Sequence, residues 1–169
     1  MKRILCSILI CTAVLSGCAG SRPSGDAAPE DFSFSLTWDA YGVSSYDSTT
    51  GKLVKTTDAT HPEDYVTTYR LTEDELTEIY ALIMALDVEL YPDTYNPNAD
   101  MYTKPSMTLI LAVKCGEVQK TIRAENIAYS FEADNRRGQA FLDTCQAIKN
   151  LLTATDAWQA LPDYEFLYQ

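Results

Sequence analysis

The sequence predicts an α+β fold: an antiparallel sheet of about five strands with two helices on one face, and a docked C-terminal tail. Two observations support this prediction. Several short segments alternate apolar and polar residues, as strands with one wet face do. Two longer segments place apolar residues at helical spacing. The segments follow the order β-β-β-α-β-β-α, and hairpins with one-sided strands favour an antiparallel sheet under two helices.

Three strands are expected before the first helix. Residues 32–38 alternate strictly, with aromatic residues and leucine on one side and serine and threonine on the other. Residues 46–54 contain turn residues that end in Gly51, which suits a hairpin with one left-handed residue. Residues 65–71 are β-branched and aromatic, which favours another strand.

A change of period then predicts the first helix. Thr72 and Glu75 form a T-x-x-E capping box, and apolar residues at helical spacing continue to Leu86. We therefore expect a helix over residues 73–87. The acidic residues of its first turn are accounted for by the positive end of the helix dipole. Residues 91–105 hold three prolines and read as a long loop.

The C-terminal third predicts a hairpin, a helix and a tail. Residues 106–123 alternate around a turn at Cys115 and Gly116. Residues 135–152 carry a helical apolar stripe. The tail after residue 157 contains five large apolar side chains, so we expect it to dock, with an added strand as one way of doing so. These side chains are Trp158, Leu161, Tyr164, Phe166 and Tyr168.

The N-terminus carries an export signal. Lys2 and Arg3 precede a mostly apolar run over residues 4–15, which is too short to span a bilayer as a helix. The run ends in the sequence LSGC, residues 15–18, which resembles the lipobox of bacterial lipoproteins. The resemblance covers only the first eighteen residues.

The lipobox resemblance implies a lipid anchor on the Cys18 thiol and cleavage just before that residue. Residues 1–17 are then the signal peptide, residues 18–30 a flexible tether rich in Gly, Ser, Pro and Ala, and residues 31–169 one globular domain. Two acyl chains anchor a protein stably. We expect the domain on the extracytoplasmic side of the cell membrane or outer membrane.

Charge limits the partners. Loss of Lys2 and Arg3 with the signal leaves 11 basic residues against 24 acidic ones, a net charge of −13. Such an acidic domain repels nucleic acid and anionic headgroups, so we expect no nucleic-acid partner and contact with the membrane through the anchor alone. The sequence has no Gly-rich phosphate loop, and we expect no cofactor.

Few residues suggest a metal site or a catalytic centre. Only Cys115 and Cys145 remain in the mature domain besides Cys18, and whether they are bridged stays open. The only histidine, His61, lies in a proline-containing segment that reads as an exposed turn. A weak calcium-loop pattern spans Asp93, Asn96, Asn98 and Asp100, but it lacks the glycine and glutamate of an EF-hand. We expect no metal and assign no catalytic residue.

The function hypothesis is a membrane-tethered module that binds an envelope protein or glycan. The expected binding surface is the uncovered sheet face, or a tyrosine-rich loop containing Tyr91, Tyr95 and Tyr102. The alternatives are an envelope hydrolase that uses carboxylates, for which His61 or paired acids would have to share a cleft, and a structural or inhibitor-like envelope protein.

Anchoring is testable through Cys18→Ser, which removes the thiol that receives lipid. The variant should incorporate no labelled palmitate and should stay unprocessed, whereas the wild-type protein should partition into detergent. A chain that starts at Asp31 behind an ordinary export signal should be soluble outside the membrane. Uptake of label by Cys18→Ser would refute the lipobox interpretation.

Overall fold

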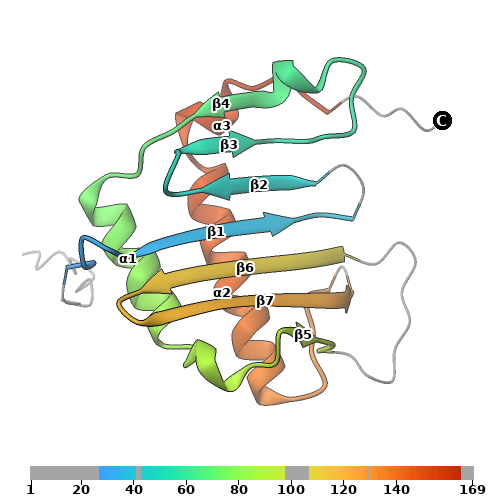
Figure 1. The fold of residues 1–169 in the computed structure, drawn as a ribbon. Helices are drawn as coiled ribbons and strands as arrows, with labels where there is room; N and C mark the ends of the chain where they lie inside the picture. Colours follow the sequence, from blue (N-terminus) through green and yellow to red (C-terminus); the bar gives the residue numbers. More distant parts are fainter. Residues whose placement is uncertain (1–26, 41–42, 98–106, 129, 165–169) are drawn as a thin grey trace, which may run out of the picture.

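Seven strands form one mixed sheet in the order β4-β3-β2-β1-β6-β7-β5. This is a computed structural model, which describes residues 27–40, 43–97, 107–128 and 130–164. The two long helices cross the same face of the sheet (Figure 1). The strands are β1 (Ser33–Trp38), β2 (Ser44–Asp47), β3 (Lys52–Val54), β4 (Val66–Thr68), β5 (Thr94–Tyr95), β6 (Met107–Cys115) and β7 (Val118–Ile127).

The α+β class is confirmed, but the five-stranded antiparallel sheet is wrong in detail. Four strands precede the first helix instead of three, because the predicted hairpin segment supplies both β2 and β3, and the strand expected at residues 65–71 is β4. A further strand, β5, lies within the segment expected to be a loop and pairs parallel with β7. It is only two residues long, and a pairing that short leaves no period in the sequence to detect.

The helices begin at polar caps close to the predicted positions. α1 (Glu73–Met84) has the predicted capping box, in which Glu75 N donates to Thr72 Oγ1 at 3.2 Å and Thr72 N donates to Glu75 Oε2 at 2.8 Å. It ends earlier than expected, and Asp87 with φ +52 leads into the 3-10 turn η2 (Val88–Leu90). α2 (Arg136–Thr153) begins after Asn135, whose side chain accepts from Gly138 N at 2.9 Å.

The core lies between the sheet and the helices, and it is formed by every second side chain along the strands. Residues of even number on β1 face the helices, and Leu36 pairs with Leu111 of β6 at the centre of the sheet. The two helices cover this face with α1 residues such as Ile79 and α2 residues such as Phe141. Burying aliphatic and aromatic side chains of this size contributes about 1.5–3 kcal/mol each.

The chain after α2 docks, but it forms no strand among its described residues. It turns into the short helix α3 (Asp156–Gln159), after which residues 160–164 are irregular. Trp158 is 7% exposed and its ring lies 5.7 Å from that of Trp38. Phe166 and Tyr168 of the predicted tail lie outside the described residues.

The N-terminal segment meets the domain at the β6–β7 turn. Ala28 packs against the core, and the carboxylate of Asp31 accepts a hydrogen bond from Gly116 N at 2.8 Å. Of the segment predicted as a tether, residues 18–26 lie outside the described part of the chain. The chain therefore enters the domain at one defined end of the sheet (Figure 1).

Two turn glycines give a matched test of the fold. Gly51 has φ +73, and a Cβ there would lie 2.7 Å from the backbone oxygen of Tyr69. Gly116 has φ +57, but a Cβ there would meet nothing within 4 Å. A left-handed non-glycine residue costs roughly 1–2 kcal/mol. Gly51→Ala should therefore lower the free energy of unfolding by about 2–3 kcal/mol and Gly116→Ala by about 1 kcal/mol in denaturant titrations.

Equal losses of unfolding free energy in the two variants would show that the short distance between Gly51 and the Tyr69 backbone does not add to the cost of a side chain at position 51.

Candidate functional site

The face of the sheet opposite α1 and α2, here called the open face, carries the side chains that alternate away from the core. Cross-strand pairing places them in rows. One row joins Asp47 of β2, Ser35 of β1, Ala112 of β6 and Thr121 of β7. The next row joins Ser33, Lys114 and Gln119.

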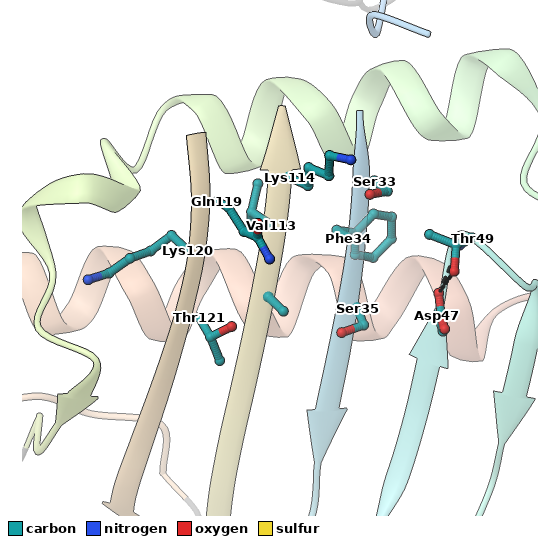
Figure 2. A pocket seen from close by; sticks show the side chains of 11 residues that line it. Ser33, Phe34, Ser35, Asp47, Thr49, Val113, Lys114, Gln119, Lys120 and Thr121 are labelled. Carbon is teal, nitrogen blue, oxygen red and sulfur yellow. Dashed lines mark hydrogen bonds between the residues drawn. The ribbon is translucent and has the colours of Figure 1, made fainter. Parts of the chain in front are cut away.

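A shallow depression of about 280 Å³ lies across these rows. Its middle is lined by small side chains, because β1 and β6 present serine and alanine there. Larger polar side chains stand around them, and Figure 2 shows these groups in front of the strands with the helices behind. The outward-facing side chains that line it are Ser33, Ser35, Asp47, Ala112, Lys114, Gln119 and Thr121.

One carboxylate of the depression is held in place. Asp47 accepts from the Thr49 hydroxyl at 2.6 Å and from Thr49 N at 2.8 Å. The hydrogen bond from the Thr49 side chain is the main reason that the pKa of Asp47 lies below its ordinary value of 3.8, with burial opposing it. The group is therefore ionised at neutral pH and can only accept hydrogen bonds.

The cations of the open face differ in their pairing. Arg123 lies 2.7 Å from Glu125 on the same strand. Within the described residues, neither Lys52 nor Lys114 forms an ion pair, and both side chains are exposed. Three basic groups thus share this face with the two acids Asp47 and Glu125, in a chain with a net charge of −11. The arrangement can bind a neutral or acidic group through hydroxyls, an amide and an unpaired ammonium.

Two tyrosines of the predicted tyrosine-rich loop, Tyr91 and Tyr95, lie in the part of the chain that the structure describes, and both pack against the domain. Tyr91 is 3% exposed, its hydroxyl donates to Arg137 O at 2.9 Å and its ring packs against Phe141. Tyr95 is half-buried, with its ring 5.7 Å from that of Tyr91. Tyr102 lies outside the described residues. The expectation that Tyr91 contacts a ligand is wrong, because its ring is buried in the core against Phe141.

The residues considered for catalysis and metal binding are dispersed. His61 Nδ1 lies 3.4 Å from Glu63 Oε1, and both side chains are about 70% exposed. Asp93 pairs with Lys120 at 2.6 Å, whereas Asn98 and Asp100 lie outside the described residues. Within the described ranges, no group of three or more His, Cys, Asp or Glu side chains could hold a metal ion. The hydrolase alternative gains no geometric support here.

One polar cluster was missed by sequence reasoning. The hydroxyl of Ser44, which is fully buried, lies against the carboxylate of Asp39 and 2.5 Å from the backbone oxygen of Lys55. The single histidine of the chain, His61, is exposed and lies against Glu63, so it is not part of this cluster. The only signal in the sequence was an aspartate directly after an alternating strand, which reads as an ordinary turn.

The two cysteines in the described part of the chain, Cys115 and Cys145, are free thiols in this structure. Cys115 is half-buried at the end of β6, whereas Cys145 is fully buried on the core side of α2. Burial raises the pKa of the Cys145 thiol well above its ordinary value. Cys145 is therefore inert in the folded state, because the thiolate is the reactive form.

Comparisons with known proteins identify no family. No family model matches the chain, and a search of curated proteins found no match. Among the described residues, no helix is long and apolar enough to cross a membrane.

Thiol labelling tests the cysteine assignment. In a chain that starts at Asp31, a maleimide should modify Cys115 under native conditions and leave Cys145 unmodified until denaturant is added. Mass spectrometry would then count one adduct before unfolding and two after it. Absence of any adduct after unfolding without reductant would instead indicate a disulfide between the two residues.

Proposed function

We propose that this protein is a lipid-anchored binding module of the bacterial envelope, and that its open face takes a polar, neutral-to-acidic surface of another envelope protein. The depression on the open face is the observation that supports this proposal most directly. The helices cover the other face of the sheet. We therefore expect a ligand to bind on the face that carries this depression.

The chemistry of the depression favours a hydrogen-bonding ligand. Its hydroxyls and the Gln119 amide both donate and accept, the Asp47 carboxylate accepts, and the Lys114 ammonium donates. A partner that brings a carboxylate to Lys114 gains a charge-assisted hydrogen bond. The excess of basic groups on this face also steers acidic partners towards it, whereas the rest of the chain repels them.

The side chains of this face favour a protein over a glycan. Sugar recognition commonly relies on an aromatic ring, but the outward-facing side chains of the depression are small, polar or charged. Of the loop tyrosines that the structure describes, Tyr91 is buried in the core and Tyr95 is half-buried. A flat polar surface of a second protein needs no aromatic platform and can match the rows of hydroxyls.

The entry point of the chain supports a ligand close to the membrane. Asp31 bonds to the turn at Gly116, and Ser33 and Lys114 lie beside that turn at one end of the depression. A flexible linker as long as the twelve residues between Cys18 and Asp31 spans at most roughly 20 Å in the root mean square, and Ala28 among them already packs against the core. If Cys18 carries the anchor, the depression stays within reach of proteins that project a short way from the same membrane.

Site-specific photocrosslinking tests the proposal on the anchored protein in cells. A photoreactive amino acid at position 35 or 121 on the open face should yield a discrete protein adduct. The same amino acid at position 78 on α1 or 146 on α2 should not. Adducts that form equally from both sets, or from the helix positions alone, would refute the assignment of the open face. A glycan adduct at position 35 would replace the protein ligand with a sugar.

A charge reversal gives the expected magnitude. Lys114→Glu should weaken binding of the crosslinked partner about tenfold, or by ~1.4 kcal/mol, because the unpaired ammonium of the depression is lost. Arg136→Glu makes the same change of charge at an exposed position of α2 and should leave the affinity unchanged. Affinity can be measured by titration of the purified partner. A matching loss in Arg136→Glu would point to net charge instead of the depression.

A further inference from the structure

The C-terminal segment is fastened to the sheet by four polar contacts at the end opposite the tether. Lys55 Nζ donates to Leu161 O at 3.3 Å, and the Tyr65 hydroxyl donates to Asp163 O at 2.9 Å. The Tyr164 hydroxyl donates to Lys55 O at 3.2 Å and lies 3.5 Å from Ser44 Oγ. Here this set of contacts is called the latch.

Aromatic rings complete the latch around one cation. The Lys55 ammonium lies 5.8 Å from the ring centre of Trp158 and 5.5 Å from that of Tyr164. Lys55 is 7% exposed, so the cation–π contacts and the carbonyl of Leu161 replace much of its water. The segment therefore shields a buried charge, and its position matters to the stability of that charge.

The Ser44 hydroxyl at the centre of the latch makes two contacts with acceptor groups but has only one proton to donate. Ser44 Oγ touches two groups that accept hydrogen bonds, the Asp39 carboxylate and the Lys55 backbone oxygen. A serine hydroxyl has one proton to donate, and a carbonyl oxygen has none. If Ser44 donates to Lys55 O, its contact with Asp39 is a hydrogen bond only when Asp39 supplies the proton.

We propose that the latch is a proton-dependent switch, closed when Asp39 is neutral and released when Asp39 ionises. In the closed state Asp39 donates to Ser44, Ser44 donates to Lys55 O, and Tyr164 donates to the second lone pair of that oxygen. When Asp39 ionises, it takes the Ser44 proton. Ser44 Oγ and Lys55 O then face each other without a hydrogen, at a separation that only a hydrogen bond makes favourable.

The groups around Asp39 can stabilise both its neutral form and its ionised form. Burial raises the pKa of Asp39 above its ordinary value of 3.8, while the hydrogen bond with Ser44 and the charge of Lys149 lower it in part. Lys149 of α2 lies 3.9 Å from Asp39 Oδ1 and stabilises the ionised form. From the tail, the Tyr164 hydroxyl lies near Asp39 through their shared neighbour Ser44. The neutral form thus has a complete hydrogen-bond chain, and the ionised form has a cation beside it.

Two further features make release feasible. The buried indole nitrogen of Trp38 has no hydrogen-bond partner within the described structure, and it belongs to the ring on which Trp158 packs. Movement of the segment would admit water to that N–H group. Asp39 itself has φ +91, an unfavourable conformation for a non-glycine residue, which a change at the end of β1 would relieve.

The direction of the pH effect follows from linkage. The closed state holds the Asp39 proton more tightly than the open state does, so closure is favoured at low pH and the advantage is lost as the pH rises through the raised pKa. Between the ordinary pKa of 3.8 and the raised one, the opening equilibrium should increase by up to about tenfold per pH unit.

Hydrogen exchange of the full-length protein in detergent tests the switch between pH 4 and pH 8. After correction for intrinsic rates, the amides of residues 156–164 should lose protection as the pH rises. Asp39→Asn keeps a neutral donor beside Ser44 and should leave these amides protected and insensitive to pH. Because the chain has only two tryptophans, Trp158 in the latch and Trp38 packed against it, tryptophan fluorescence should follow the same transition.

Matched variants separate the switch from general titration. Asp163→Asn removes an exposed acid of the same segment, and His61→Gln removes the only imidazole; both should keep the wild-type pH dependence. Lys149→Met removes the cation that favours ionised Asp39 and should move the transition to higher pH. A pH dependence that survives in Asp39→Asn overturns the proposal. If Asp39→Asn does not fold, a transition that stays in place in Lys149→Met overturns it instead.

Discussion

The pairing of β1 with β6 is the constraint on which the other parts of the structure depend. It joins residues that are about 75 positions apart in sequence, with Leu36 opposite Leu111, and it places these two strands in the middle of the sheet. Because side chains alternate along a strand, this register commits one face of the sheet to the core and the other to solvent. A slip by one residue would exchange Leu36 for a serine or threonine and bury the open face.

The same alternation produces the candidate site. The core needs large side chains on β1 and β6, and the positions between them are free to be small and polar. Ser35 and Ala112 are opposite each other, so the middle of the open face is low while Asp47 and Lys114 stand at its borders. The depression is therefore mainly a consequence of side-chain size on two adjacent strands, with Thr49 of the β2–β3 turn at its border.

Sequence reasoning predicted the elements that carry a strong period and missed those held by tertiary contacts. The alternation of residues 32–38 and the Thr72–Glu75 capping box are local signals, and both appear in the structure where they were expected. The two residues of β5 are a strand only because β7 lies beside them. Tyr91 looked like a loop aromatic because its neighbours are turn residues, but its partner Phe141 is 50 positions away. The uncovered face could be foreseen from alternation, whereas the depression depends on the register between β1 and β6.

The edges of the sheet explain why a partner would approach its face. β4 and β5 form the two edges and contain three and two residues. Edges this short offer few backbone groups to an added strand and protect the sheet from edge-to-edge association. The two ends of the sheet are also occupied, one by Asp31 at the β6–β7 turn and the other by the segment around Tyr164. The helices cover the second face of the sheet. The open face is then the large surface on which side chains remain available to contact a partner.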